Sequence, residues 1–280
     1  MSFGDGIAKI NSYSLTDFHD FESCSFRFFV RHHLDKKYEI EEGSKSLALG
    51  SLLDQSIKKF HKSKAYGQSL DYLANLVRAA INSMKEDDAR KPKPSFYTNT
   101  IPFLTEELFE KAVQIFKNFY SIRQLKINQS IAEVGFCEVL LDINGIKFKL
   151  WGGPDTLELG DDGIPEIIDY KSRENLENVQ FDMDLMPKIY TLLCSKNLLK
   201  RGYKKARFKV RIWQDPLKES FYEEFDLENL SGIEFLFKQK IEKILATKQI
   251  NFCEGIFCKA CKSPKRDEYL GKLKNLGLNI

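Results

Sequence analysis

The segment 152–171 constrains the fold of this chain more than any other part of the sequence. Two short apolar runs, at 156–159 and 164–168, flank the tetrapeptide Gly160-Asp161-Asp162-Gly163. Glycine and aspartate in this arrangement are typical of a turn between two strands. We therefore predict a β-hairpin. Its open end, opposite the turn, lies near residues 155 and 169.

Three ionisable side chains converge at that end of the predicted hairpin. Asp155 begins one strand and Asp169 ends its partner, so the antiparallel pairing places them side by side. Lys171 shares the face of Asp169, because side chains alternate along a strand. Two carboxylates and an ammonium group suit a hard divalent cation and a phosphate. The alternative is a turn aspartate beside an exposed strand pair, but the apolar Ile167-Ile168 indicates a buried strand.

At this segment the sequence resembles the RecB-like branch of the PD-(D/E)XK nuclease superfamily. The family's motif is G-x-x-D, a hairpin, and then two apolar residues followed by D-Y-K, which correspond here to 152–155 and 167–171. The resemblance extends along nearly the whole chain, and it includes stand-alone exonucleases and CRISPR-adaptation nucleases. It implies a restriction-endonuclease-like α/β core, in which helices flank a central mixed sheet of about five strands.

A helix is predicted from Ser46 to about Tyr66, because apolar residues recur there at helical intervals. Asp54 lies in its middle, where an aspartate is costly unless it is paired. The resembling family carries a histidine or an acid at this position and points it at the metal. Further helices are predicted at 69–88, 103–125, 180–200 and 228–247. Near the start of the chain, Ser14 followed by Asp17 predicts a helix N-terminus.

The resemblance also implies the roles of the site residues. Asp155, Asp169 and Asp54 would hold one or two Mg²⁺ or Mn²⁺ ions, with the Tyr170 carbonyl as a further ligand, and Lys171 would orient or deprotonate the attacking water. Two residues match supporting positions of the family: Glu138, on a strand predicted at 133–142, and Tyr190. Met186 stands where the family usually has a glutamine. For Glu138, a solvent-facing glutamate in an alternating strand remains an equal alternative.

The net charge of +3 does not indicate nucleic-acid binding by itself, so a basic surface has to come from local clustering. The segment 200–211 contains seven basic residues and no acid. Arg207, Lys209 and Arg211 alternate with apolar residues, which predicts a strand with one basic face. We favour a track for the DNA backbone over an edge strand protected by its charges.

The sequence contains six cysteines. Its N-terminus lacks the pattern of a signal peptide, and no run of eighteen apolar residues occurs in it. A cytoplasmic location with reduced thiols is therefore expected. Three cysteines lie close together in the sequence: Cys253, Cys258 and Cys261. The resemblance implies Cys24 as the fourth ligand of a [4Fe–4S] cluster, with Zn²⁺ as the alternative. Cys137 and Cys194 are expected to be small buried residues.

We predict a single domain over 1–280, with a helical insertion at 62–128 and a cysteine-rich, metal-bound C-terminal cap at 248–280. The function implied by the resemblance is that of a metal-dependent DNA nuclease, and specifically an exonuclease on single strands or DNA ends. Such a nuclease would act in DNA repair or CRISPR adaptation. Its partner would be a helicase or a similar protein. One alternative is a DNA-binding module with a degenerate, inactive nuclease site. Another is a zinc-stabilised interaction protein.

Overall fold

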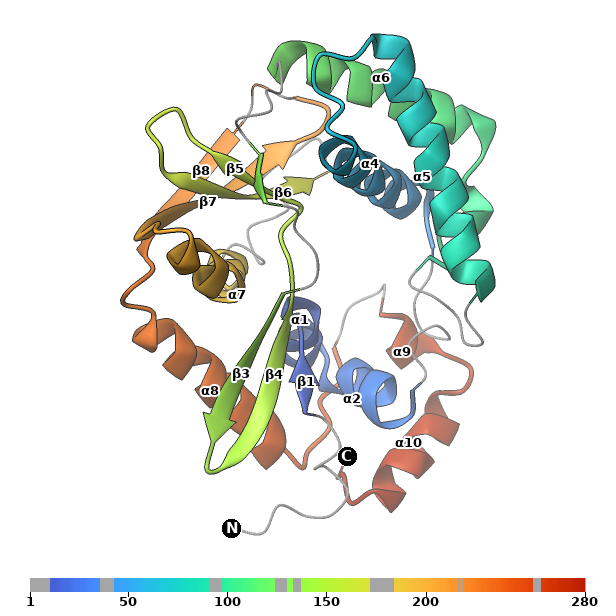
Figure 1. Ribbon diagram of the computed structural model, residues 1–280. Helices are drawn as coiled ribbons and strands as arrows, with labels where there is room; N and C mark the ends of the chain where they lie inside the picture. Colours follow the sequence, from blue (N-terminus) through green and yellow to red (C-terminus); the bar gives the residue numbers. More distant parts are fainter. Residues whose placement is uncertain are drawn as a thin grey trace. The chain divides into compact units, whose positions relative to one another are not determined.

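The computed structural model describes residues 11–35, 43–90, 97–123, 130–132, 137–171, 184–215, 217, 219–253 and 258–279 (Figure 1). They form two compact units, each assembled from separate stretches of the chain. Unit 1 comprises Met1–Glu42, Cys137–Gly152 and Asn229–Ile280, and unit 2 comprises Gly43–Phe136 and Gly153–Glu228. The expectation of one domain with an insertion and a cap stays a prediction, and each unit is described by itself below.

Unit 2 contains a five-stranded mixed sheet with the strand order β2-β5-β6-β7-β8. Strands β6 and β7 are parallel, and the other neighbouring pairs are antiparallel. The strands are β2 (Ser130–Ala132), β5 (Thr156–Leu159), β6 (Pro165–Lys171), β7 (Lys205–Ile212) and β8 (Glu219–Asp226). The predicted α/β class with a mixed sheet flanked by helices is therefore confirmed.

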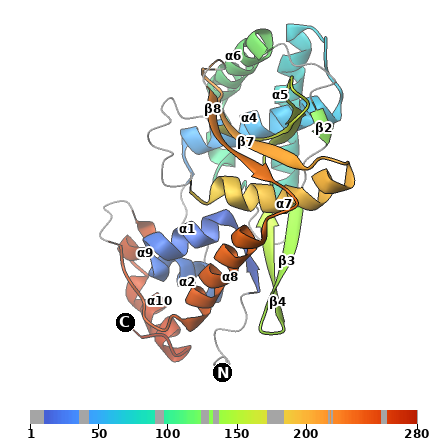
Figure 2. The same ribbon diagram turned by 90° about the vertical axis from the view of Figure 1, so that its left-hand side faces the viewer.

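Helices cover both faces of this sheet (Figures 1 and 2). On one face lie α4 (Lys45–Lys62), α5 (Leu70–Arg90), the short 3₁₀ helix η1 (Ile101–Phe103) and α6 (Glu106–Arg123). Their apolar side chains share one core with Ile168, Tyr170 and Trp213 of the sheet. The opposite face is covered by α7 (Met186–Lys200), whose Tyr190 ring lies 6.1 Å from the ring of Phe208. Cover on both faces explains why every residue of β6 before Lys171 is buried.

The hairpin between β5 and β6 has the predicted register and turn. Thr156 pairs with Ile168 and Leu159 with Pro165. Gly163 adopts a φ of 80°, a conformation that glycine reaches without steric strain. Its amide donates to the carbonyl of Gly160, and the Gly160 amide donates to that of Ile164, so the turn closes on its own hydrogen bonds.

Unit 1 contains a separate three-stranded sheet with the order β1-β4-β3. Its strands are β1 (Ser12–Tyr13), β3 (Cys137–Ile143) and β4 (Ile146–Gly152). Asn144 and Gly145 join β3 to β4 with φ angles of 54° and 82°, as a type I′ turn requires. The predicted strand at 133–142 corresponds to β3 over residues 137–142, and 133–136 lie outside the described residues.

The described helices of unit 1 are α1 (Leu15–Ser23), α2 (Ser25–His33), α8 (Ser231–Ala246), α9 (Lys259–Lys262) and α10 (Arg266–Asn275). The predicted start of α1 is confirmed, since the Ser14 amide donates to Asp17 Oδ2 at 2.7 Å. Phe18 of α1 lies 5.4 Å from Phe237 of α8, ring to ring, so segments far apart in the sequence share this core. Among the described helices, none has the combination of length and hydropathy that crossing a membrane requires.

Candidate active site

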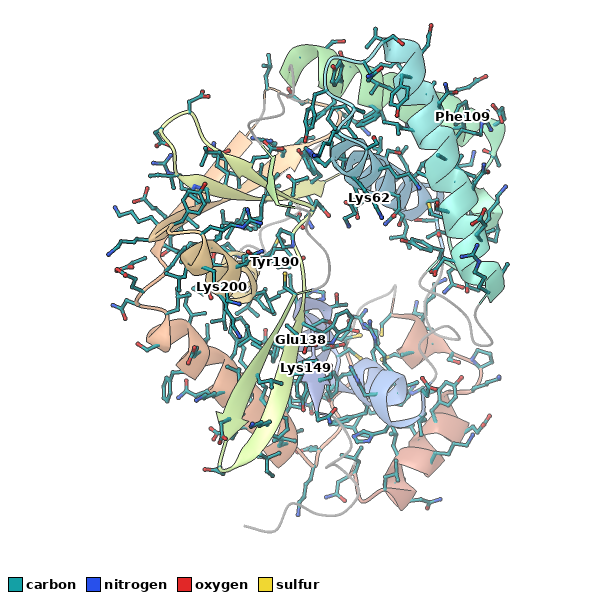
Figure 3. All side chains as sticks on the ribbon, in the orientation of Figure 1. Lys62, Phe109, Glu138, Lys149, Tyr190 and Lys200 are labelled. Atoms are coloured by element: carbon teal, nitrogen blue, oxygen red, sulfur yellow. The ribbon has the colours of Figure 1, made fainter. Side chains whose placement is uncertain are left out.

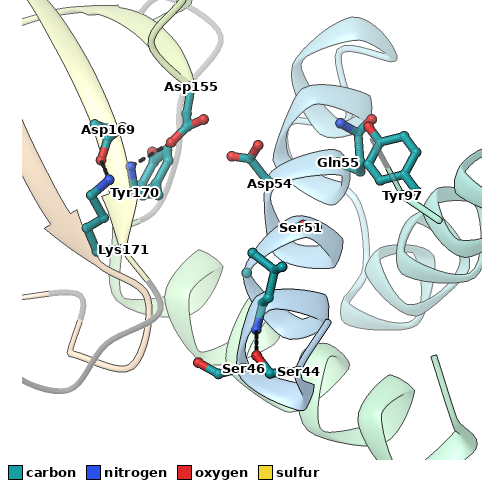
Figure 4. A pocket seen from close by; sticks show the side chains of 12 residues that line it. Ser44, Ser46, Ser51, Asp54, Gln55, Tyr97, Asp155, Asp169, Tyr170 and Lys171 are labelled. Carbon is teal, nitrogen blue, oxygen red and sulfur yellow. Dashed lines mark hydrogen bonds and ion pairs between the residues drawn. The ribbon is translucent and has the colours of Figure 1, made fainter. Parts of the chain in front are cut away.

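Asp155 and Asp169 lie at neighbouring strand ends in unit 2. The Asp155 amide donates to the carbonyl of Ile168 at 2.9 Å, which continues the hairpin pairing up to Asp155. The Tyr170 amide in turn donates to Asp155 Oδ2 at 2.7 Å (Figure 4). The Asp155 carboxylate is therefore held by the backbone of β6, directly beside Asp169.

A pocket of about 390 Å³ lies between these strand ends and α4 (Figure 4). Asp54, Asp155, Asp169, Tyr170 and Lys171, which the sequence places at the metal and catalytic positions, all line it. Asp54 reaches it from the middle of α4, and Gly50 and Ser51, one turn earlier, also contribute to the wall. The structure thus brings the three carboxylates to one cavity from two elements that are far apart in the sequence.

Lys171 follows Asp169 on the same face of β6. Its Nζ lies 2.7 Å from Asp169 Oδ2, and the Asp169 side chain is almost fully buried. Because β6 alternates, the side chain of Tyr170 points the other way, into the helical core, where its ring stacks on Trp213 at 4.5 Å between centroids. Because of this alternation, Asp169 and Lys171 line the pocket, and the ring of Tyr170 between them anchors the strand in the core.

The carboxylates of the pocket perturb one another. Burial, and then the neighbouring carboxylates of Asp54 and Asp169, raise the pKa of Asp155 well above its usual range. Such crowding disfavours the charged form unless a cation lies nearby. Carboxylate oxygens are the ligands that Mg²⁺ and Mn²⁺ prefer, so the donor set and its charge fit a divalent ion.

Sequence reasoning missed a second lysine at this site. Lys58 lies one turn after Asp54 on α4, and its Nζ is 3.0 Å from Asp54 Oδ2 and 3.7 Å from Asp155 Oδ1. Burial alone would lower the pKa of Lys58, but Asp54 and Asp155 raise it to about 12. The spacing of four residues, which puts two side chains on one helix face, was the sequence signal for this contact.

The expected basic track on β7 requires a correction. Arg211 is only 5% exposed, and its guanidinium is paired with Glu158 at 2.6 Å and Glu166 at 3.3 Å. Lys209 Nζ lies 2.7 Å from the same Glu166. Arg211 is therefore an internal ion-pair partner and not a surface contact for DNA. The reason is that β5 and β6 place acids opposite the basic face of β7.

Arg207, the third residue of that track, lies nearer the surface but is also paired. Its Nη1 is 2.5 Å from Asp162 in the hairpin turn, and its Nε is 3.1 Å from Glu224 on β8. Acids from two neighbouring elements thus compensate its charge. The basic run along the sequence does not produce a basic surface of the same extent.

Neither of the two supporting residues lines the described pocket. Glu138 belongs to β3 of unit 1, is mostly exposed, and pairs with Lys149 at 2.7 Å (Figure 3). This is the solvent-facing position that its alternating strand also allowed. Tyr190 lies on α7 in contact with Phe208, on the side of the sheet opposite α4. Their catalytic support stays a prediction.

Four cysteines meet in unit 1. The sulfur atoms of Cys24, Cys253, Cys258 and Cys261 all lie within 4.8 Å of one another. Cys24 stands between α1 and α2, Cys258 precedes α9 and Cys261 lies within it. Burial raises the pKa of the Cys24 thiol to about 11, so a cation would be needed to hold four thiolates here. Among the remaining cysteines, Cys194 is buried and Cys137 is partly exposed.

A mixed sheet with two acids and a lysine at adjacent strand ends, facing an acid on a helix, defines the class of restriction-endonuclease-like α/β proteins. The family model described as the PD-(D/E)XK nuclease superfamily matches residues 12–266. The chain belongs to the PD-(D/E)XK nuclease superfamily. The match covers both units.

No curated protein matches the chain. One solved structure that it resembles is described as "Crystal structure of SSO0001". The similarity has 12% identity and a TM-score of 0.31, and covers 77% of this chain and 84% of that one. Values this low support no inference about either fold or function.

Proposed function

We propose that this protein is a metal-dependent nuclease that hydrolyses phosphodiester bonds in DNA, as an exonuclease on single strands or DNA ends. The observation that carries the proposal is the pocket of unit 2, where Asp54, Asp155, Asp169 and Lys171 gather around one cavity. Membership of the nuclease superfamily supports the reaction class. DNA as the substrate, and exonucleolytic cleavage, follow from the resemblance to the RecB-like branch.

Asp54, Asp155 and Asp169 would hold one or two Mg²⁺ or Mn²⁺ ions, with the Tyr170 carbonyl as a further ligand. When bound, such an ion lowers the pKa of water into the neutral range and offsets the negative charge that develops on the phosphate. The protein's own part is to fix the carboxylates. The hydrogen bond from the Tyr170 amide to Asp155 does this for one ligand, and the packing of α4 does it for Asp54.

Lys171 is assigned to the attacking water and the scissile phosphate. Its ion pair with Asp169 stabilises the ammonium form and aims it along the pocket wall. In that form it donates hydrogen bonds, so its proposed role is to orient the water and to stabilise the phosphate as negative charge accumulates. Removal of the water's proton is then left to the solvent or to a free carboxylate oxygen.

The alternative function is a DNA-binding module with an inactive nuclease site. Three observations favour it: Asp54 replaces the histidine, Met186 replaces the glutamine, and Lys58 already pairs with Asp54 and Asp155. Both functions require DNA binding, and only the first requires cleavage. A third, weaker candidate is a zinc-stabilised interaction protein, in which only the four cysteines matter.

We further propose that the four cysteines hold a structural metal centre in unit 1. The sequence favoured [4Fe–4S]. The sulfur spacing favours a single zinc ion. Four thiolates around one zinc ion, at Zn–S distances of about 2.3 Å, lie roughly 3.8 Å from one another. The sulfur atoms of Cys253 and Cys261, and those of Cys258 and Cys24, are 3.8 Å apart. A [4Fe–4S] cluster is larger, and the thiols would have to separate to hold it.

A role in DNA repair or CRISPR adaptation and a helicase as partner are proposed from the resemblance alone, and the cytoplasmic location stays an expectation from the sequence. None of them is needed for the reaction proposed for unit 2. They become testable once the substrate has been established.

The test uses DNA labelled at either end, single- or double-stranded, incubated with Mg²⁺, Mn²⁺ or EDTA, with products resolved by length. We expect cleavage with metal, none with EDTA, and mononucleotides or short products that identify the end attacked. The control is Asp169→Asn, which keeps the shape of the side chain and removes its charge. Wild-type cleavage by Asp169→Asn would rule out the assigned site, and DNA binding without cleavage would favour the inactive module.

A further inference from the structure

Lys58 joins two elements of unit 2 that together form the proposed metal site. Asp54 belongs to α4 and Asp155 precedes β5, and the Lys58 ammonium group contacts both carboxylates, at 3.0 and 3.7 Å. Lys171, in contrast, is paired with Asp169, on its own strand. Lys58 is therefore the cation that the structure places between Asp54 and Asp155.

The oxygens that Lys58 contacts belong to two of the proposed metal ligands. An ammonium group and a divalent ion repel each other, and both are attracted by the same carboxylates. The lysine side chain is long and flexible, and that of Lys58 is 35% exposed, so it can leave without disturbing the core of α4. Displacement of this one side chain is enough to free both carboxylates.

We propose that Lys58 is a built-in counter-ion of the metal site, which holds Asp54 and Asp155 together in the metal-free protein and which a divalent ion displaces on binding. This inference rests on the proposed function, since it takes these carboxylates as metal ligands. Its consequence is that Lys58 weakens metal binding. A higher concentration of metal is then needed to fill the site, and the metal-free protein is protected from repulsion between its acids.

The test is a titration with Mn²⁺ alone, in which electron paramagnetic resonance reports the free ion. Wild type is compared with Lys58→Gln, Lys58→Met and Lys58→Arg, and with Lys62→Gln as the matched control, an exposed lysine one turn further along α4 (Figure 3). We expect Lys58→Gln and Lys58→Met to bind Mn²⁺ at least tenfold more tightly than wild type. Lys58→Arg and Lys62→Gln should remain within about twofold of wild type.

Thermal unfolding gives a second measurement that does not depend on cleavage. In EDTA, Lys58→Met should unfold at a lower temperature than wild type, because the two carboxylates lose their cation. Saturating Mn²⁺ should remove that difference. Met was chosen because it keeps the aliphatic stem of the lysine. If a packing defect caused the lower unfolding temperature, Mn²⁺ would not remove the difference, and that result would count against the proposal.

The outcomes separate this proposal from the proposed nuclease. If wild type and Lys58→Gln bind Mn²⁺ equally well and wild type cleaves DNA, the counter-ion role is wrong and the nuclease stands. If Lys58→Gln binds Mn²⁺ more tightly and no variant cleaves, the counter-ion role stands and the nuclease fails. If neither protein binds Mn²⁺, Lys58 is only an ion-pair partner and the proposal is overturned.

Discussion

The sulfur atoms of Cys24 and Cys261 lie 3.5 Å apart, although 237 positions separate the two residues in the sequence. This contact joins the segment between α1 and α2 to α9, near the other end of the described chain. Two thiols at that distance without a disulfide are not a stabilising pair by themselves. Their proximity has a physical reason if a metal ion or cluster binds both.

The first prediction concerns Cys24→Ser. We expect the variant to lose the bound metal and to unfold at a lower temperature, because structural metal sites contribute to folding energy directly. Elemental analysis and visible absorption of anaerobically purified protein distinguish the metals. One zinc and no colour indicate Zn²⁺, whereas a brown protein with about four irons indicates [4Fe–4S]. Cys137→Ser is the control, and a wild-type protein without metal would refute the centre.

The second prediction concerns the carboxylates and lysine of the pocket. Asp155→Asn, Asp169→Asn and Lys171→Met should each lower the cleavage rate by at least about 100-fold, with an unchanged circular dichroism spectrum. Asp54→Asn should fall between them and wild type. Asp161→Asn, in the turn at the opposite end of the same hairpin, should cleave at the wild-type rate. Normal cleavage by Lys171→Met would remove it from the reaction.

The third prediction concerns the buried arginine of β7. Arg211→Met should lower the free energy of unfolding by about 3–5 kcal/mol, because it removes the guanidinium from buried Glu158 and one of the two cations beside Glu166. Lys205→Met, which removes an exposed ion pair with Glu224, should leave it nearly unchanged. Urea denaturation measures both. An Arg211→Met protein of normal stability with weakened DNA binding would favour the DNA track over an internal role for Arg211.

The fourth prediction is a pH dependence in unit 1. Burial alone would raise the pKa of Asp17, but the hydrogen bond and charge of His32, with Arg31 and Ser14, lower it below its usual value. A carboxylate whose folded pKa is depressed stabilises the protein above its unfolded pKa, and this contribution is lost as the pH falls through the folded pKa. The stability advantage of wild type over Asp17→Asn should therefore be full near neutral pH and shrink in acid.

Urea denaturation of both proteins over a pH series measures that advantage. Comparing the two proteins at each pH cancels effects of acid on the cysteines. The control is Asp35→Asn, at the end of the described segment that carries α2. If the difference between wild type and Asp17→Asn stayed constant down to the lowest pH, the carboxylate would not be responsible.

The sequence was most informative where structure depends on neighbours in the chain. The turn 160–163 and the pair Asn144-Gly145 have backbone requirements that few residues meet, so both hairpins could be predicted with their registers. Apolar spacing along one segment determines which face is buried, so the helices predicted at 69–88, 103–125 and 228–247 agree with α5, α6 and α8 to within a few residues. Residues 180–183 of the helix predicted at 180–200 lie outside the described residues, and α7 begins at Met186. The convergence of Asp155 and Asp169 followed from antiparallel pairing alone.

The sequence was least informative where structure depends on which segments become neighbours. Alternation showed that β7 has a basic face, but not that β5 and β6 would place Glu158 and Glu166 opposite it. The four-residue spacing of Asp54 and Lys58 puts both on one helix face, but it does not show that Asp155 completes the group, and Lys58 was therefore missed. That the strands of 137–152 would form a sheet of their own, in unit 1, also depends on long-range pairing with Ser12 and Tyr13.

The composition of unit 1 from three separate stretches has a consequence for biosynthesis. The last described strand of unit 2, β8, ends at Asp226, whereas unit 1 still requires α8, α9 and α10. During translation, Cys24 therefore leaves the ribosome long before Cys253, Cys258 and Cys261 exist. We expect the sheet of unit 2 to fold on the nascent chain, while the thiols of Cys24 and its partners can be metallated together only after Cys261 has been synthesised.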